Sequence, residues 1–141
     1  MTTFLLKTEP SVFSYDDLAR LGNTLWDGVT NNAALAHIRS ARRGDEAFIY
    51  HTGDEKRIVG LARILSDPVE DPKNPGRNAK GEPKFAVFGL EAVRKAPSPV
   101  TLTQIRKDRR FAAFALVKQP RLSVMPVPPE LDAALRAMTG L

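Results

Sequence analysis

The apolar residues of this chain are gathered in short runs that lie far apart in the sequence. Each run has the length of a β-strand, and none is long enough for a helix of ordinary size. The five runs are 2–7, 47–52, 57–65, 84–93 and 121–127. Strands that recur at such distances, with helical patterns between them, predict an α+β fold. We expect four to six strands in a small mixed β-barrel surrounded by short helices.

The segments between these runs carry helix and turn signals. Ser14 before Asp16 and Asp17 is typical of a helix start, Asn31 or Asn32 can cap another helix, and Thr101 fits a capping box. The predicted helices are 15–21, a helix after the asparagines that ends by residue 44, one that starts at 101 and continues through 111–117, and one from 128 onward. Runs 47–52 and 57–65 form a predicted hairpin, and the proline-rich segment 67–83 a long exposed loop.

Length and composition narrow the class of protein. A chain of 141 residues suits one domain over 1–141. The lack of cysteine excludes disulfides, thiolate zinc sites and a cysteine nucleophile, so we expect neither a structural metal nor a cofactor. No secretory signal pattern or membrane-length apolar run is found. These features predict a cytoplasmic monomer with no membrane partner.

Positive charge is concentrated in the second half of the chain. Residues 1–70 carry 8 Lys and Arg against 10 Asp and Glu, whereas residues 71–141 carry 13 against 6. The formal net charge of the whole chain is +5. Such an asymmetry fits a polyanionic partner, and it fits a plain solvated surface equally well.

Four stretches together resemble the EVE domain family in order and spacing: FLLKTEPSVFSYDDL, LWDGVTNN, IYHTGDEKRIVGLARI and ALVKQPRLSVMPV. The resemblance covers essentially the whole chain. It implies a PUA-like β-barrel, distantly related to YTH domains, and recognition of a modified base in DNA or RNA. Trp26 looks similar to a YTH tryptophan that forms part of an aromatic cage around a methylated adenine.

The chain departs from the usual EVE pattern at several positions. Thr30-Asn31-Asn32 and Ala34-Leu35-Ala36 stand where family members tend to carry Arg-Asn and Ala-Arg-Asn. Phe85 replaces a frequent Trp, Gly89 a usual Asp, and Pro120 a common Ser. These departures concern the identity of the ligand rather than the fold.

Trp26 is the only tryptophan, and it is followed at once by polar and turn-forming residues. It can be core filling, or it can be a pocket wall on which a flipped base stacks for about 1–3 kcal/mol. In the second case Asp27 would accept a hydrogen bond from an exocyclic amine, and Asn31 would flank the base edge. Val29 belongs to the same candidate segment. Asp27 is equally suited to a plain turn.

Polar residues at the ends of two predicted strands form the next candidates. Lys7 can meet a phosphate and Thr8 a base or sugar, although a surface pair of Lys7 with Glu9 is an open alternative. In the second strand, alternation sends Tyr50 and Thr52 to one face and His51 to the other. We expect one of these faces to point into the pocket, while His51 also suits a structural role.

The basic half contributes the remaining candidates. Arg121 suits bidentate contact with phosphate or base, with Gln119 and Ser123 beside it. A second cage wall is expected from Phe85, Tyr50 or elsewhere. The charge run Arg106, Lys107, Arg109 and Arg110 is interpreted as a solvated helix face, or at most a phosphate track, outside the site.

The leading hypothesis is a non-catalytic reader. In it, methylated or hydroxymethylated cytosine, or methylated adenine, is flipped into a pocket walled by Trp26. The alternative is a small hydrolase that acts on a modified nucleoside or related amide with His51, Lys7 and Glu9 as acid and base. A partner-binding module is a third reading. The predicted base-binding residues are Lys7, Thr8, Glu9, Trp26, Asp27, Val29, Asn31, Tyr50, His51, Thr52, Phe85, Gln119, Arg121 and Ser123.

Overall fold

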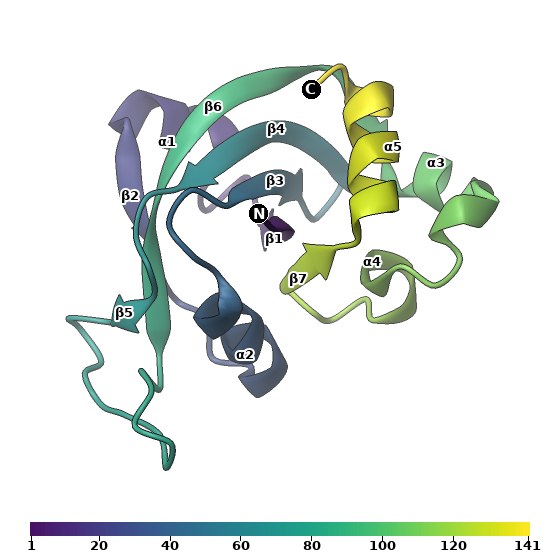
Figure 1. Ribbon diagram of the computed structural model, residues 1–141. Helices are drawn as coiled ribbons and strands as arrows, with labels where there is room; N and C mark the ends of the chain where they lie inside the picture. Colours follow the sequence, from purple (N-terminus) through teal and green to yellow (C-terminus); the bar gives the residue numbers. More distant parts are fainter.

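The computed structural model describes residues 1–141 as one curved, seven-stranded mixed sheet with helices packed around it (Figure 1). The strands are β1 (Thr3–Thr8), β2 (Asn23–Trp26), β3 (Glu46–His51), β4 (Arg57–Ile64), β5 (Val69–Glu70), β6 (Ala86–Thr101) and β7 (Val124–Val127). Their order in the sheet is β2-β6-β4-β3-β1-β7, and β5 pairs with β6 off this path. Strand β1 is parallel to β3, and every other pairing is antiparallel. The prediction of a mixed fold of strands and short helices is confirmed.

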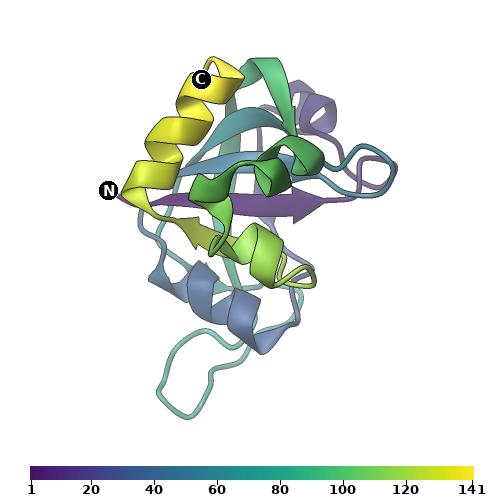
Figure 2. The ribbon, with the colours of Figure 1, turned by 90° about the vertical axis from the view of Figure 1, so that its right-hand side faces the viewer.

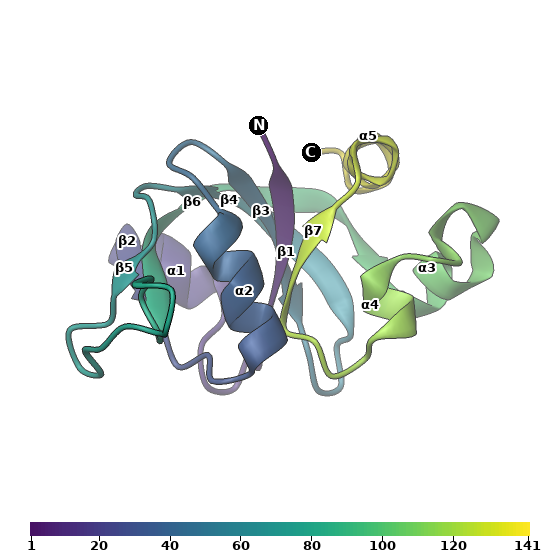
Figure 3. The ribbon, with the colours of Figure 1, turned by 60° about the horizontal axis from the view of Figure 1, so that its bottom comes forward.

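The sheet is open. Its edge strands β2 and β7 have no hydrogen-bonded pairing with each other, so the predicted barrel is not confirmed. Helix α2 (Asn32–Ser40) lies between these edges and packs against both β7 and β6 (Figure 3). Its buried residues Ala34, Leu35 and Ile38 fill that position. The gap in the strand pairing is therefore covered by an amphipathic helix.

The other helices are α1 (Tyr15–Leu21), α3 (Leu102–Lys107), the 3₁₀ turn η1 (Arg109–Phe111), α4 (Ala115–Lys118) and α5 (Pro129–Thr139). The predicted helix start at Ser14 and the predicted capping box at Thr101 are present, the Ser14 cap also forms a capping box, and Asn31 rather than Asn32 caps α2. The predicted continuous helix over 111–117 is wrong, because Phe114 takes an extended backbone and separates η1 from α4. None of the helices has the length and hydropathy that a membrane crossing requires.

Strand β6 is much longer than the predicted strand 84–93 and continues through Pro97 and Pro99. Gly60 pairs with Lys95 and Ile58 pairs with Val100, so residues 96–99 bulge opposite a single residue of β4. Prolines are tolerated in a bulge because no ladder hydrogen bond is lost there. Two further strand predictions needed correction: β7 begins only at residue 124, and the short β2 was missed because just one of its four residues is buried. The predicted loop 67–83 projects away from the sheet, and β5 is its only strand (Figures 1 and 2).

One cluster of 34 buried residues forms the core, and it includes Trp26. The hairpin of β3 and β4 is confirmed, and α1 packs against it through a close approach of Tyr15 to Gly60. A Cβ atom at Gly60 would lie 2.5 Å from the Tyr15 ring, so only glycine leaves room for it. The Tyr15 hydroxyl donates to the Leu61 carbonyl at 2.8 Å. The start of α1, and with it the loop that precedes α1, is thereby fixed on the sheet. That 1–141 forms a single domain stays a prediction.

Candidate functional site

A cavity of about 590 Å³ lies beside the end of β2. Its wall comes from three parts of the chain: the end of β1 with the loop before α1, strand β2 with the turn after it, and the segment before β7. The lining residues are Lys7, Thr8, Val12, Phe13, Thr24, Leu25, Trp26, Asp27, Gly28, Val29, Thr30, Asn31 and Ser123. Seven of the predicted site residues are thus brought together: Lys7, Thr8, Trp26, Asp27, Val29, Asn31 and Ser123.

Trp26 belongs to the core and to the cavity wall at the same time. It ends β2, pairs with Phe88 of β6, and keeps 8% of its surface exposed. The Phe13 ring meets the indole edge to face, with centroids 6.1 Å apart and planes at 71°. Such an arrangement is the preferred geometry for two aromatic rings. Trp26 is therefore core filling and also lines a cavity, with Phe13 as its aromatic neighbour; that a base stacks on it stays a prediction.

The turn after Trp26 places a free acceptor and a free donor at the cavity. Gly28 adopts φ +77°, a left-handed conformation that favours glycine. Asn31 accepts from the Ala34 amide through Oδ1 at 3.0 Å, and its Nδ2 group has no partner within the chain. Asp27 is exposed and forms neither a hydrogen bond nor an ion pair. The cavity therefore offers one carboxylate acceptor and one amide donor to a ligand.

The end of β1 supplies two polar groups that are already engaged. Lys7 donates from Nζ to the Pro120 carbonyl at 2.9 Å, and burial lowers its pKa from the ordinary value. Thr8 donates from its hydroxyl to the Phe13 carbonyl at 2.6 Å. Thr8 thus holds the loop that carries Phe13. The alternative surface pair of Lys7 with Glu9 is not formed, because Glu9 has other partners.

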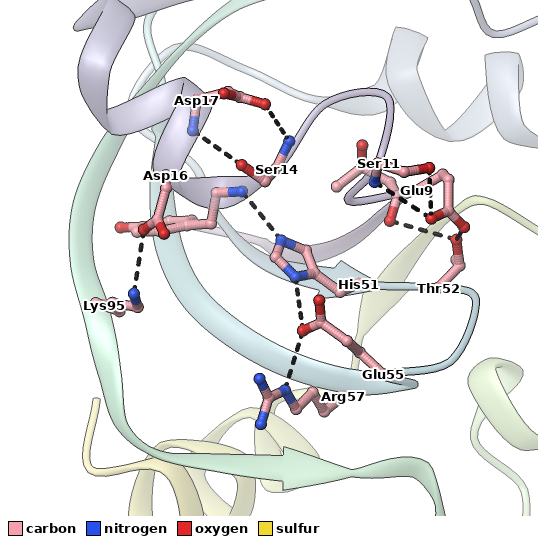
Figure 4. A network of polar contacts seen from close by, with 12 residues as sticks. Glu9, Ser11, Ser14, Asp16, Asp17, His51, Thr52, Glu55, Arg57 and Lys95 are labelled. Carbon is pink, nitrogen blue, oxygen red and sulfur yellow. Dashed lines mark hydrogen bonds and ion pairs between the residues drawn. The ribbon is translucent and has the colours of Figure 1, made fainter.

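Glu9 ties the loop before α1 to the β3–β4 turn (Figure 4). Its carboxylate accepts from the Ser11 amide at 3.3 Å, the Ser11 hydroxyl at 3.1 Å and the Thr52 hydroxyl at 3.2 Å. The Ser11 hydrogen bonds hold the pKa of Glu9 below its ordinary value. Glu9 does not line the Trp26 cavity. In this arrangement it shapes the loop rather than facing a ligand.

His51 is buried and lies on the opposite face of β3 from Tyr50, and both of its ring nitrogens are used (Figure 4). Nε2 accepts from the Tyr15 amide at 3.0 Å, so Nδ1 carries the proton and donates to Glu55 at 3.0 Å. Glu55 also accepts from Arg57 at 3.1 Å, and the His51 hydrogen bond lowers the Glu55 pKa. The acid–base set of His51, Lys7 and Glu9 is not assembled, because each side chain has a separate structural partner.

The remaining predicted residues lie outside the Trp26 cavity. Tyr50 and Thr52 line a second cavity of about 340 Å³, and Gln119 and Arg121 line a shallow one of about 280 Å³ that also touches Asn31. Phe85 is half-buried beneath the Lys84 ammonium, 5.3 Å from the ring centroid. The expected second aromatic wall is therefore neither Phe85 nor Tyr50.

The sequence analysis missed Phe13 as a lining residue, together with Val12, Thr24, Leu25, Gly28 and Thr30. Phe13 stands inside the stretch FLLKTEPSVFSYDDL, so its family context was visible. What the sequence could not show is that the loop before α1 folds back to bring Phe13 against Trp26, thirteen positions further along the chain. That placement depends on two tertiary hydrogen bonds, from Thr52 to Glu9 and from the Tyr15 amide to His51.

Comparisons with known proteins give a consistent picture. The family model for the EVE domain matches residues 2–138. Thymocyte nuclear protein 1 from Gallus gallus is 29% identical over 156 aligned positions, which cover 90% of this chain and 64% of the chicken protein. This chain therefore spans less than two thirds of that relative's length.

Two solved structures are similar over nearly their whole lengths. A protein from Rhodopseudomonas palustris has a TM-score of 0.88 and 38% identity, covering 99% of this chain and 94% of the other. Human THYN1, solved in complex with DNA that contains 5-methylcytosine, has a TM-score of 0.86 and 25% identity, covering 100% and 99%.

Proposed function

Because the chain belongs to the EVE domain family, we propose that it is a DNA-binding domain that recognises a modified base in the cavity beside Trp26. The observation that carries the proposal is this cavity, which combines an indole wall with a free acceptor and a free donor. Its volume of about 590 Å³ lies within the range of small-molecule sites, about 300–1,000 Å³. The complex of human THYN1 with 5-methylcytosine DNA supports the choice of ligand.

The polar groups of the cavity suit a cytosine edge. The free Asp27 carboxylate would accept from the exocyclic amine, and the free Asn31 Nδ2 would donate to a ring acceptor. Stacking on Trp26 would add about 1–3 kcal/mol. A buried methyl-sized group contributes about 0.8 kcal/mol, which is roughly a fourfold preference for the methylated base. We therefore expect a modest preference for 5-methylcytosine over cytosine.

The same proposal covers how the sheet closes into a barrel and in which oligomeric state the domain binds DNA. In it, the domain is a PUA-like barrel in which α2 takes the place of a closing strand pair between β7 and the β6–β2 edge. It binds DNA as a cytoplasmic monomer, with the basic second half of the chain meeting the phosphate backbone. RNA with the same modified base is the competing ligand, and the binding experiment includes it.

The test is a set of binding titrations with matched oligonucleotides: DNA with one 5-methylcytosine, the same DNA unmodified, and the corresponding RNAs. We expect the methylated DNA to bind several-fold more tightly than the unmodified strand. Asp27→Ala removes an exposed side chain with no partner in the protein, so it should keep the fold and weaken both DNAs. Two Trp26 variants are titrated alongside: Trp26→Phe keeps an aromatic ring in the core, whereas Trp26→Ala removes the indole wall of the cavity.

The result is decisive in either direction. Equal affinities for modified and unmodified strands, unchanged in Asp27→Ala and Trp26→Ala, would contradict the proposal. If the methylated RNA binds more tightly than the methylated DNA, the base pocket stands and the ligand is RNA instead of DNA.

A further inference from the structure

The second cavity, of about 340 Å³, adjoins the Trp26 cavity, since Lys7 lines both. Three of its ten lining residues are cations, namely Lys7, Lys56 and Arg106, and none is a carboxylate. None of these three cations forms an ion pair with another residue. Uncompensated positive charge in a hollow attracts an anion more strongly than the same charge on a flat surface.

The backbone brings two of these cations together from distant parts of the chain. Lys56 in the β3–β4 turn has φ +47°, the only positive value at a non-glycine residue. Lysine is rare in this conformation, where glycine or asparagine is favoured. The Lys56 carbonyl accepts from the Leu102 amide at 2.8 Å, which fastens the turn to α3. Arg106 stands four positions after Leu102 on that helix, so both residues face the same hollow.

Tyr50 adds a hydroxyl group to these charges. Its side chain is buried, but the hydroxyl has no hydrogen-bond partner within the chain, and the Lys7 ammonium lies 5.9 Å from the ring centroid. Burial raises the pKa of Tyr50, while the positive charge of Arg106 acts in the opposite direction. The phenol therefore stays protonated at neutral pH and is available as a donor.

Two carboxylates on neighbouring segments already have hydrogen-bond partners of their own. Glu9 accepts from Ser11 and from Thr52, and Glu55 accepts from His51 and Arg57. Neither of them lines the cavity. An incoming anion thus meets ammonium, guanidinium and hydroxyl donors without an opposing carboxylate in the wall.

We propose that the second cavity binds a backbone phosphate of the same strand whose modified base enters the Trp26 cavity. The inference rests on the proposed function, and it adds that the ligand is held at two points, base and phosphodiester, with Lys7 between them. Arg106 can meet two phosphate oxygens at once, whereas Lys56 and Lys7 act as point charges. A free phosphate ion or a mononucleotide offers the same chemistry, and the test separates these sources from a polynucleotide.

The test uses methylphosphonate, a neutral replacement for one phosphodiester at a time, on either side of the 5-methylcytosine. We expect one flanking position to weaken binding about three- to tenfold, and the same position to have a smaller effect on Arg106→Gln, in which only Lys7 and Lys56 still face the phosphate. Arg106→Gln itself should lower the slope of log K against log salt concentration by about 0.7–0.9. The matched control is Arg109→Gln, which removes the same charge from an exposed residue of η1 outside the cavity and should stay sensitive to that methylphosphonate.

Each outcome has a separate meaning. If every methylphosphonate weakens the wild type and Arg106→Gln equally, while methylated DNA is still preferred, the phosphate site is wrong and the base pocket stands. If wild type shows no preference for the methylated base, the proposed function fails instead. Competition by inorganic phosphate or deoxycytidine monophosphate as strong as by the oligonucleotide would overturn the assignment to a strand.

Discussion

Phe13 provides the sharpest prediction, because the sequence left the second aromatic wall to Phe85, Tyr50 or another residue, and Phe13 is the aromatic residue that lines the cavity beside Trp26. Its ring lines the cavity and meets Trp26 edge to face at 6.1 Å. Phe13→Ala removes an aromatic side chain from the cavity wall, and base–aromatic contacts contribute about 1–3 kcal/mol per base. We expect a loss of about 1–2 kcal/mol in binding free energy, which is a fall in affinity of roughly 5- to 30-fold.

The assay is fluorescence anisotropy with a labelled 5-methylcytosine oligonucleotide at fixed salt. Phe85→Ala is the matched control, since Phe85 is also a half-buried phenylalanine packed on the core but lies outside the cavity. Urea unfolding of both variants separates loss of fold from loss of binding. A Phe85→Ala defect as large as that of Phe13→Ala, at comparable stability, would refute the assignment of the wall.

Three further predictions concern stability. Gly60→Ala should destabilise the protein by about 1–3 kcal/mol through overpacking against the Tyr15 ring; an unchanged urea midpoint would show that the ring moves away freely. Thr101→Ala should lower the free energy of unfolding by about 1 kcal/mol through loss of the α3 capping box, with no change expected for Thr103→Ala, an exposed control. The His51 hydrogen bond lowers the pKa of Glu55, so the ionised Glu55 stabilises the folded protein at neutral pH, and this stabilisation is lost as the pH falls below about 4. Thermal melts should show a fall in melting temperature over that pH range, and the fall should be smaller in Glu55→Gln.

Helices and strands could be predicted from the sequence where the residues that specify them are neighbours in the chain. The caps at Ser14 and Thr101 place their helices correctly, because a capping side chain and the amide it binds are three residues apart. Strands β1, β3 and β4 follow from their apolar runs. By contrast, the extension of β6 past Pro97 depends on a bulge opposite β4, which is distant in the sequence. The run over 111–117 is interrupted by the extended backbone of Phe114, which its apolar pattern does not reveal.

The residues of the candidate site also fall into those that were predictable from one stretch of sequence and those that only the fold brings together. Trp26, Asp27 and Asn31 are close in sequence, so their grouping was predictable from one stretch. His51 was a candidate because it ends a predicted strand, with a structural role left open, and its two nitrogens hold the start of α1 and the β3–β4 turn. These partners, the Tyr15 amide and Glu55, come together with His51 only in the folded chain. Arg106 was left out as part of a charge run, and the fold, not its local sequence, brings it beside Tyr50.

The most direct test uses Trp26 itself, which is the only tryptophan and hence the only source of indole fluorescence. The emission of the wild-type protein is followed while a 5-methylcytosine oligonucleotide is added. A base that stacks on the indole should quench it saturably, with the same dissociation constant as anisotropy gives. Binding by anisotropy with no change in Trp26 emission would contradict the central claim that the cavity beside this residue receives the base.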